Sequence, residues 1–376
     1  MMLRASAWIM SMGLAFAAAC TPSSSSETSG SGGDGGASGS PGGAASSSGG
    51  SSGAGDGPEL PAGTLLYVRA ETRDHDVLVA RDLDGGEERV LTDLTGDGSS
   101  GWNIDSYALS ADRRRIAIAS LYGPTKEDTA TGLATRAIWS FATDGTDPRR
   151  LTPTFPNRSG GRQHYEIDVG EPMWTADGAG VVFGFGEYWM EGANLQGGSF
   201  PWLVSAAGGA PPSAIPTSTA CTVVYPSRNP ETGDMLYIHS VCIPGQGERG
   251  LYLYPEEGSK SPKQLLGSSS SGIDVYLATP SWLADGSGFL FLGSTAETNQ
   301  APAIFAYDTS AGAATMLAAP PSGSYVRGVA ISPDGTKIVY CLETDSKRDL
   351  HLLDVSTAKP TEKAITSDGT SCNPSF

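Results

Sequence analysis

Ten residues near the C-terminus decide the fold of this chain: Ile331-Ser332-Pro333-Asp334-Gly335-Thr336-Lys337-Ile338-Val339-Tyr340. Pro at the second turn position and Gly at the fourth favour a type I turn closed by a bulge, which joins two strands in a tight hairpin. The same pattern returns at 174–183 and 282–291, where Trp begins it and Phe ends it. Weaker copies run over 109–118 and 228–237. The sequence therefore predicts one structural unit that is used repeatedly.

Four strand-like segments recur in a fixed order around each of these hairpins. The first ends at an anchor residue before the turn, and the second follows the turn. The third is short and apolar, and the fourth is a short apolar segment that several times reads Leu-Thr. A period of about 45–65 residues with four strands per unit is typical of a β-propeller. The anchors of units two to six are Leu109, Trp174, Arg228, Trp282 and Ile331.

The two ends of the repeat region complete each other. The first unit lacks its first strand, while the chain finishes Asn373-Pro374-Ser375-Phe376, a copy of the segment 279–282. We therefore predict an all-β, six-bladed β-propeller over 61–376. It is closed three-plus-one, with the C-terminal strand completing the N-terminal blade. Such closure removes the open sheet edge that would invite aggregation.

The repeat also resembles a known family. The units are similar to the TolB-type propeller repeat in four successive patterns. These are Pro-x-Trp-x-x-Asp-Gly, an aliphatic-x-aromatic strand, Ile-Trp or Ile-Phe, and Leu-Thr. The resemblance covers essentially all of 61–376 and implies the fold more strongly than the function. TolB proteins add an N-terminal α/β domain, and a Ser/Gly-rich segment stands there in this chain. Related propellers cap serine peptidases of the prolyl-oligopeptidase type, but no such hydrolase domain accompanies the repeats.

The first nineteen residues read as a signal peptide. Arg4 is followed by an apolar run and then by small residues, a pattern too short for a membrane span. The end of this segment, Ala17-Ala18-Ala19-Cys20, resembles the lipobox of bacterial lipoproteins, although Ala17 stands where that motif prefers Leu. The resemblance implies cleavage before Cys20 and lipid attachment to it. The alternative is an ordinary signal peptide with an incidental cysteine.

We expect residues 20–60 to be a lipidated cysteine, as the lipobox resemblance implies, and a tether. The segment is nearly all Ser, Gly and Ala, which cannot build a core and is expected to stay disordered. Within it, 49–53 matches G-x-S-x-G, but without a preceding strand we interpret the match as chance. We expect an exported protein anchored by lipid to the bacterial cell envelope, at the outer membrane, with no other membrane contact.

The charge and the scattered histidines exclude several classes of site. Against 41 Asp and Glu the chain has 24 Lys and Arg, a net charge of -17, which argues against nucleic-acid binding. The four His residues show no metal-ligand spacing. The acidic turns at 82–88 and 93–97 do not follow the spacing of a calcium loop. We therefore expect no cofactor and no metal, with calcium kept as an alternative.

Four cysteines remain after Cys20. An even number in an exported protein suggests two disulfides, with three possible pairings. Cys221 and Cys242 lie equidistant from the turn at 231–232, so they should face each other across one hairpin. That leaves Cys341 to pair with Cys372, which would tie the sixth blade to the closing strand. The alternative is that some of these are buried free thiols.

The long insertions all fall on one face of the expected propeller. Turns after strands one and three form a plain face, which we call the turn face. Loops after strands two and four form the opposite face, which we call the loop face. On the loop face lie the insertions 94–105, 121–136, 153–171, 184–200 and 241–249. Binding residues concentrate on long loops held by rigid scaffolds. The candidate partner-binding residues are Trp102, Arg162, His164, Tyr165, Glu187, Tyr188 and Trp189.

These observations favour a monomeric binding module without catalytic residues. It would bind a protein, a peptide or a cell-envelope component through the loop face. One alternative is a propeller enzyme of the hydrolase or lyase class with its site on that face or in the central funnel. Another is a passive scaffold. The aromatic residues of the insertions could also serve only to pack the loops.

Overall fold

The computed structural model describes residues 57–376, apart from 73–74, 84, 93–102, 121–135, 154–157, 160–161, 193, 218, 220, 244, 256–261 and 358–359. The expected signal peptide, Cys20, nearly all of the expected tether, and Trp102 lie outside the described residues. No helix within the described ranges is long and apolar enough to cross a membrane.

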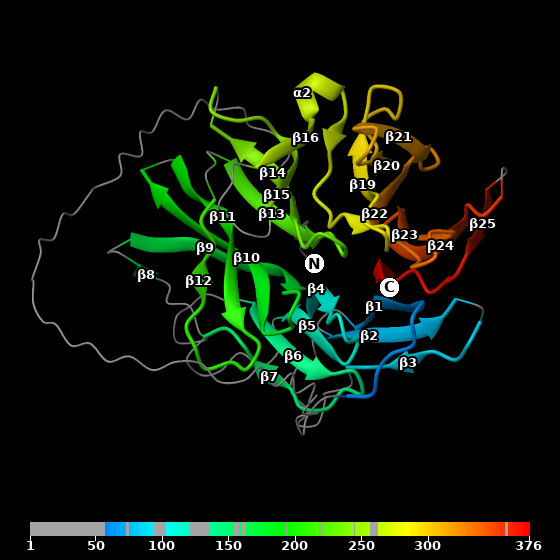
Figure 1. Ribbon diagram of the computed structural model, residues 1–376, viewed down its shortest axis with the longest axis horizontal. Helices are drawn as coiled ribbons and strands as arrows, with labels where there is room; N and C mark the ends of the chain where they lie inside the picture. The colour runs from blue at the N-terminus through cyan, green and yellow to red at the C-terminus, as the bar shows by residue number, and fades with distance from the viewer. Residues whose placement is uncertain are drawn as a thin grey trace, which may run out of the picture. The chain divides into compact units, whose positions relative to one another are not determined.

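The described residues form six antiparallel sheets that follow one another in chain order (Figure 1). Blade 1 contains β26 (Ser371–Ser375), β1 (Thr64–Thr72), β2 (His75–Asp82) and β3 (Arg89–Val90). Blade 2 contains β4 (Ile104–Leu109), β5 (Arg115–Ser120), β6 (Ala137–Ala142) and β7 (Arg149–Arg150). Blade 3 contains β8 (Arg158–Ser159), β9 (Arg162–Trp174), β10 (Gly180–Glu191), β11 (Asn194–Ser205) and β12 (Ser213–Ala214). The fold class is the predicted six-bladed β-propeller.

The other three blades repeat the arrangement. Blade 4 contains β13 (Cys221–Arg228), β14 (Met235–Cys242), β15 (Gly250–Tyr254) and β16 (Lys263–Gly267). A short helix, α2 (Ser268–Ser271), leads to blade 5, with β17 (Asp274–Val275), β18 (Ser281–Trp282), β19 (Gly288–Ser294), β20 (Ala303–Asp308) and β21 (Ala313–Ala318). Blade 6 contains β22 (Ser324–Ile331), β23 (Lys337–Thr344), β24 (Lys347–Asp354) and β25 (Thr361–Ala364). We call the strand at the other end of each sheet from β3, β7, β12, β16, β21 or β25 its inner strand; these are β26, β4, β9, β13, β17 with β18, and β22, and the short β8 pairs with β9.

The hairpin that opened the sequence argument has the predicted turn. The backbone N–H of Gly335 donates to the carbonyl of Ser332 at 2.8 Å, and the N–H of Ser332 donates to the carbonyl of Lys337 at 2.8 Å. Gly335 has φ 71°, in the left-handed region where a side chain would be strained. The turn is thus a type I turn closed by a bulge.

The ring closes as predicted. The C-terminal strand β26 pairs antiparallel with β1, with Ser375 opposite Leu66 and Cys372 opposite Val68, and Figure 1 shows the C-terminus beside β1. A disulfide joins Cys341 of blade 6 to Cys372, with the two Cα atoms 5.1 Å apart. Hydrogen bonds and a covalent link therefore both hold the last strand in the ring.

The second predicted disulfide is also present. Cys221 lies opposite Cys242 across β13 and β14, and their Cα atoms are 3.9 Å apart. The pairing inferred from the hairpin register is thus present, and so is the Cys341–Cys372 pairing that remained.

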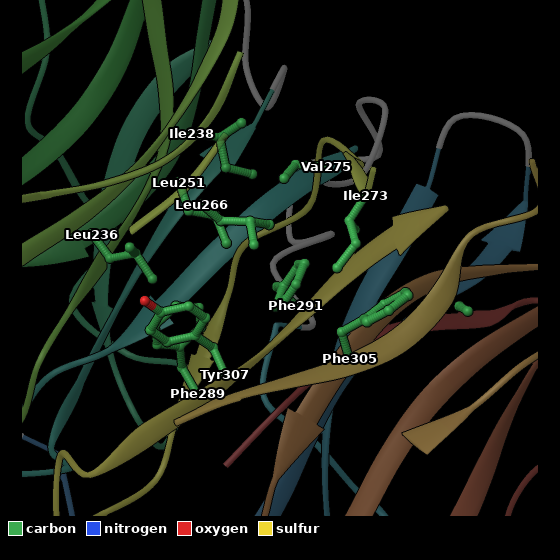
Figure 2. Packing of buried hydrophobic residues seen from close by; sticks show 11 residues of the cluster. Leu236, Ile238, Leu251, Leu266, Ile273, Val275, Phe289, Phe291, Phe305 and Tyr307 are labelled. Carbon is green, nitrogen blue, oxygen red and sulfur yellow. The ribbon is translucent and has the colours of Figure 1, made fainter. Parts of the chain in front are cut away.

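The hydrophobic cores lie between neighbouring blades. Figure 2 shows the cluster between blades 4 and 5, where Ile238 and Leu251 face Phe291 and Phe305. Similar clusters lie between blades 1 and 2, 2 and 3, 5 and 6, and 6 and 1. A middle strand must therefore be apolar on both faces, as β5 is from Ile116 to Ala119. This explains runs such as Ile-Ala-Ile-Ala, which lack the alternation of a strand with one solvated face.

Residues 57–60 pack against the turn face of blade 2, ahead of the expected start of the propeller at 61. Leu60 is 1% exposed and joins the core between blades 1 and 2. Its N–H donates to the carbonyl of Arg113 at 3.0 Å, and Nε of Arg113 donates to the carbonyl of Leu60 at 2.8 Å. The hydroxyl of Thr143 donates to the carbonyl of Pro58. The folded part therefore includes these four residues.

One expected loop is a pair of strands. Residues 184–200 continue β10 and β11 without a break in register, from Gly184 opposite Pro201 to Glu191 opposite Asn194. β9 runs alongside, and Trp189 lies opposite His164. The apolar and polar residues alternate poorly here, so the sequence resembled an insertion. Hydrogen bonding along three strands instead extends blade 3 past the others on the loop face.

Candidate functional site at the channel

Bulges interrupt the inner strands of the ring at polar or aromatic residues. In three blades a residue and the following proline together lie opposite a single residue of the next strand: Glu171-Pro172, Tyr225-Pro226 and Asn373-Pro374. Proline lacks an N–H, so it tolerates a bulge where a ladder bond is missing. The residue before each proline has a positive φ, of 56°, 54° and 53° in chain order.

The other inner strands are interrupted at nearby positions. β4 carries one extra residue, Asp105, and β22 carries one, Arg327. In blade 5 the inner strand is split between β17 and β18, and Tyr276 follows β17. Backbone irregularities at bulges re-aim side chains and are frequent next to functional sites.

Hydrogen bonds join these inner segments from blade to blade. The hydroxyl of Tyr107 donates to the carbonyl of Asn373 at 2.6 Å, and the N–H of Glu171 donates to Oγ of Ser106 at 2.8 Å. Ser227 Oγ donates to the carbonyl of Pro280 at 2.7 Å. Nη1 of Arg327 donates to the hydroxyl of Tyr276 at 2.5 Å. These bonds tie the inner strands of neighbouring blades to one another.

Carboxyl groups gather around one arginine where the inner strands of blades 2 and 3 meet; we call this region the channel. Arg136, just before β6, bonds through Nη1 to Oδ1 of Asp168 at 2.7 Å and through Nη2 to Oδ1 of Asp105 at 3.2 Å. Gly170 allows this approach, because a Cβ there would lie 3.2 Å from Oδ2 of Asp105. Burial raises the pKa of Asp105, with Arg136 opposing the shift and Asp168 adding to it. Blades 2 and 3 are thus joined by one cation between two carboxylates.

Glu171 is the most perturbed acid of this group. Its Oε2 accepts the backbone N–H of Tyr225 at 2.8 Å, and a Cβ on Gly184 would lie 3.0 Å from the same oxygen. Burial raises the pKa of Glu171 from 4.5 to about 8. Asp105 and Asp168 add to this rise, while the Tyr225 N–H and Arg136 oppose it. At neutral pH the carboxyl is therefore mostly protonated, which is typical of functional acids.

Tyr225 completes the group from blade 4. Its ring packs against the core between blades 4 and 5. Burial raises the pKa of its hydroxyl well above the usual value, and the charges of Glu171, Asp105 and Asp168 add to the effect. The hydroxyl is therefore within electrostatic reach of all three carboxyl groups. We call Asp105, Arg136, Asp168, Glu171 and Tyr225 the channel cluster.

The projecting part of blade 3 rises directly from the channel cluster. We call residues 162–168, 186–191 and 194–199 the blade 3 extension. Asp168 lies opposite Gly186 and Ile167 opposite Glu187. A Cβ on Gly186 would lie 2.9 Å from Cε2 of Tyr188 and 3.5 Å from Cβ of Asp168. The ring of Tyr188 therefore folds back over the strand beside the cluster.

The predicted binding residues divide into two groups. Six of the seven lie on the blade 3 extension: Arg162, His164, Tyr165, Glu187, Tyr188 and Trp189. The extension thus brings together segments that the sequence separated by more than twenty residues. Glu187, Tyr188 and Trp189 are half-buried, and the indole nitrogen of Trp189 is shielded from solvent. The seventh, Trp102, lies outside the described residues.

The sequence analysis missed the channel cluster. The only signal for it was a large polar residue before the proline that precedes an anchor, as in Glu171-Pro172 and Tyr225-Pro226. Asp105, Arg136 and Asp168 have no such mark, and only the ring brings them together. Over the ranges that the structure describes, no three His, Cys, Asp or Glu side chains are arranged to hold a metal ion.

Comparison with known proteins bears on the fold. No protein-family model matches the chain, and no curated protein matches it. Among solved structures, TolB from Acinetobacter baumannii is similar with a TM-score of 0.57 and 16% identity, over 83% of this chain and 66% of that one. The fold is that of a TolB-like propeller. This chain therefore spans just under two thirds of the length of the Acinetobacter protein.

Two enzymes show a weaker likeness. An oligogalacturonate lyase from Vibrio parahaemolyticus has a TM-score of 0.47 and 14% identity, over 80% of this chain and 73% of that one. A puromycin-hydrolyzing peptidase from Mycobacterium tuberculosis has a TM-score of 0.47 and 10% identity, over 84% of this chain and 56% of that one. Likeness at this level carries no argument about chemistry, because one fold hosts many functions.

Proposed function

We propose that this protein is a binding module of the cell envelope, whose partner docks on the loop face where the channel cluster meets the blade 3 extension. The observation that carries the proposal is that two members of the cluster, Asp168 and Glu171, lie on β9, in the same sheet as the blade 3 extension. Asp168 of the cluster lies opposite Gly186, and Trp189 follows three residues later on β10. A docked partner would contact both features at once.

The chemistry of this surface suits a protein, a peptide or another envelope component. The extension carries Tyr188 and Trp189, and the side chains of Met190 and Phe200 are 47% and 39% exposed. Aromatic residues bury a large area at a small entropic cost and are enriched in interface hot spots. Below them, the channel cluster provides charged and hydrogen-bonding groups that would select the partner.

The proposal includes export and lipid attachment at Cys20, with the propeller held on the cell envelope by the tether. It also takes the protein to act as a monomer and to bind no nucleic acid. Mass spectrometry of the mature N-terminus should find diacylglycerol on Cys20. The variant Cys20→Ser should leave the membrane fraction, and unchanged partitioning would contradict the anchor.

A pull-down from native envelope tests the docking surface. The wild-type chain should capture a partner that Trp189→Ala captures poorly, with an affinity loss on the order of 2 kcal/mol or more. Val90→Ala is a matched control, because Val90 is 41% exposed but lies on the outer strand of blade 1. If Trp189→Ala lowers the melting temperature and leaves capture intact, the indole serves packing and the proposed surface is wrong.

One observation favours an enzyme of the hydrolase or lyase class as a second candidate. Glu171 holds a proton at neutral pH beside ionisable neighbours, as a general acid would. In that case Glu171→Gln would abolish turnover of a substrate while leaving its binding nearly unchanged. A binding module predicts no turnover for either protein.

A further inference from the structure

The outer strand of blade 5 differs from the outer strands of the other blades. β21 is six residues long and reads Ala-Ala-Thr-Met-Leu-Ala, without a charge. Among the described residues the outer strands of the other blades are two to five residues long, and all but β12 carry a charged side chain. Short edges and charged side chains keep other chains from pairing with an open sheet edge. β21 has neither form of protection.

Leu317 of β21 occupies a position that is buried in other blades. In the ladder between the third and fourth strands, it corresponds to Leu91 of blade 1 and Leu151 of blade 2. Both of those leucines are 2% exposed and belong to the cores between blades. Leu317 is 43% exposed, and Met316 beside it is 40% exposed. Blade 5 therefore presents to solvent a leucine that blades 1 and 2 bury.

A threonine that blade 5 lacks accounts for this difference. In three other blades the residue after the buried one is a threonine, whose hydroxyl accepts a backbone N–H of the third strand. These are Thr92, Thr152 and Thr366. Blade 5 has Ala318 at this position, and Ala318 itself pairs with Ile304, which leaves Leu317 as a bulge in the ladder. The strand therefore continues further than β3 or β7, and the bulge turns Leu317 outward.

The backbone of β21 is open along its outer edge. β21 pairs with β20 and with no other strand in the described part of the chain, and Figure 1 shows it at the outer end of blade 5. An edge strand points the N–H and C=O of every second residue away from the sheet. Among the described residues no backbone group bonds to these outward groups of 313–318. The edge thus offers a row of free donors and acceptors beside two exposed apolar side chains.

We propose that β21 binds an extended segment of a partner protein, which adds to blade 5 as a new outermost strand. The segment pairs with the outward N–H and C=O groups and covers Met316 and Leu317. It is uncharged and apolar where it passes these two side chains, because a charge buried there would have no partner. This site goes beyond the proposed function, since it lies on the rim of blade 5 and leaves the loop face available to the first partner.

The edge itself selects a separate polypeptide over other occupants. Lipid chains offer nothing to the outward N–H and C=O groups. Residues 21–56 of this chain contain no Val, Leu, Ile, Met or aromatic residue to cover Leu317. A second copy would bring a second net charge of -17. It would also pair only six residues, far less than the roughly 800 Å² per partner of a standard interface. An extended segment meets neither obstacle, because main-chain hydrogen bonds hold it in place.

A peptide that copies part of β20 is the probe, because β20 already pairs with β21 from the inner side. It has the sequence of 303–307, Ala-Ile-Phe-Ala-Tyr, flanked by one Ser at each end, acetylated and amidated. A second peptide keeps these side chains but is N-methylated at its three central residues, which removes N–H donors from both of its edges. Binding to the full chain in detergent is measured by calorimetry. We expect only the first peptide to bind, and amide hydrogen exchange to slow in 313–318.

Variants test the edge directly. Leu317→Lys should weaken binding of the peptide by at least about tenfold, because a charge on the edge opposes strand pairing and the apolar contact is lost. Val90→Lys is the matched control and should bind as wild type does. Val90 is 41% exposed and takes the ladder position of Met316, but on the two-residue edge of blade 1. If the melting temperature shows that Leu317→Lys does not fold, Met316→Lys replaces it with the same expectation.

Several results would overturn the inference. They are no binding of the first peptide, equal binding of the two peptides, unchanged binding by Leu317→Lys, and slowed exchange outside 313–318 only. A concentration-dependent dimer in ultracentrifugation that Leu317→Lys abolishes would identify a second copy as the occupant and refute a partner segment. None of these results bears on capture at the loop face, which Trp189→Ala tests, so the two proposals fail separately.

Discussion

Replacing Glu171 by Gln should stabilise the protein more at alkaline pH than at acidic pH. In the folded state the carboxyl is buried beside Asp105 and Asp168, and its pKa is raised from 4.5 to about 8. In the unfolded chain the same group ionises near its ordinary value. Between these two pH values the unfolded state loses a proton that the folded state keeps.

The sign and the size of the change in stability with pH follow from this difference in bound protons. Below pH 4.5 both states hold the proton, so the group leaves stability unchanged. From about pH 4.5 to about pH 8 stability falls by at most about 1.4 kcal/mol per pH unit, and above that it is constant. The limit over the whole interval is about 5 kcal/mol. Because Glu171 keeps some accessible surface, we expect about 2–3 kcal/mol.

Guanidinium chloride unfolding of wild type and Glu171→Gln at pH 4.5 and pH 8.5 measures the effect. The amide of Gln keeps an oxygen that can accept the N–H of Tyr225. Any effect of the substitution on the unfolding free energy that does not depend on pH cancels when the two pH values are compared. Glu191→Gln serves as control and should show the same change in unfolding free energy at both. If Glu171→Gln also shows the same change at both, Glu171 ionises normally in the folded protein and the reasoning about the channel cluster fails.

Three further predictions concern the closure of the ring, its N-terminal contact and a buried histidine. Removing the Cys341–Cys372 disulfide by replacing both cysteines with Ala should lower the unfolding free energy by roughly 3–4 kcal/mol, since it closes a loop with a sequence separation of 31; an unchanged denaturation midpoint would show that the bond contributes little. Leu60→Ala should cost about 2–4 kcal/mol, because Leu60 is 1% exposed in the core between blades 1 and 2; if the cost is below about 1 kcal/mol, residues 57–60 are not part of the folded domain. His239 is 2% exposed, and burial lowers its pKa from 6.5 to about 4. Stability should therefore fall as pH drops from about 6.5 to about 4, because the unfolded state binds a proton first, and this slope should be absent from a denaturation series on His239→Gln.

Repetition made much of the fold predictable from the sequence. The turn at 332–335 requires a residue that tolerates a positive φ at its last position. The equivalent residues of two other copies, Gly178 and Gly286, also have a positive φ. Local chemistry therefore fixed the hairpins, and counting them gave the number of blades. One disulfide followed because register across a hairpin is also local, and the other because only two cysteines then remained. Cys221 and Cys242 lie at matching distances from one turn.

The blade 3 extension shows where local reasoning stopped. Residues 184–200 contain several glycines and little alternation, so their sequence resembles a loop. Three neighbouring strands supply the hydrogen bonds that make them a sheet. Strand propensity depends on such neighbours, which a single segment does not reveal.

By itself the sequence determined the repeating blade, the number of blades, the closure of the ring by the C-terminal strand and the partners of four cysteines. Each of these depends on patterns within one hairpin or on a match between two segments. The tertiary structure alone decided the channel cluster, whose members come from blades 2, 3 and 4 and lie up to 120 residues apart, as Asp105 and Tyr225 do. The reason is physical, because a buried carboxyl acquires its pKa from the charges and the desolvation that surround it in space. Those surroundings exist only once the ring has closed.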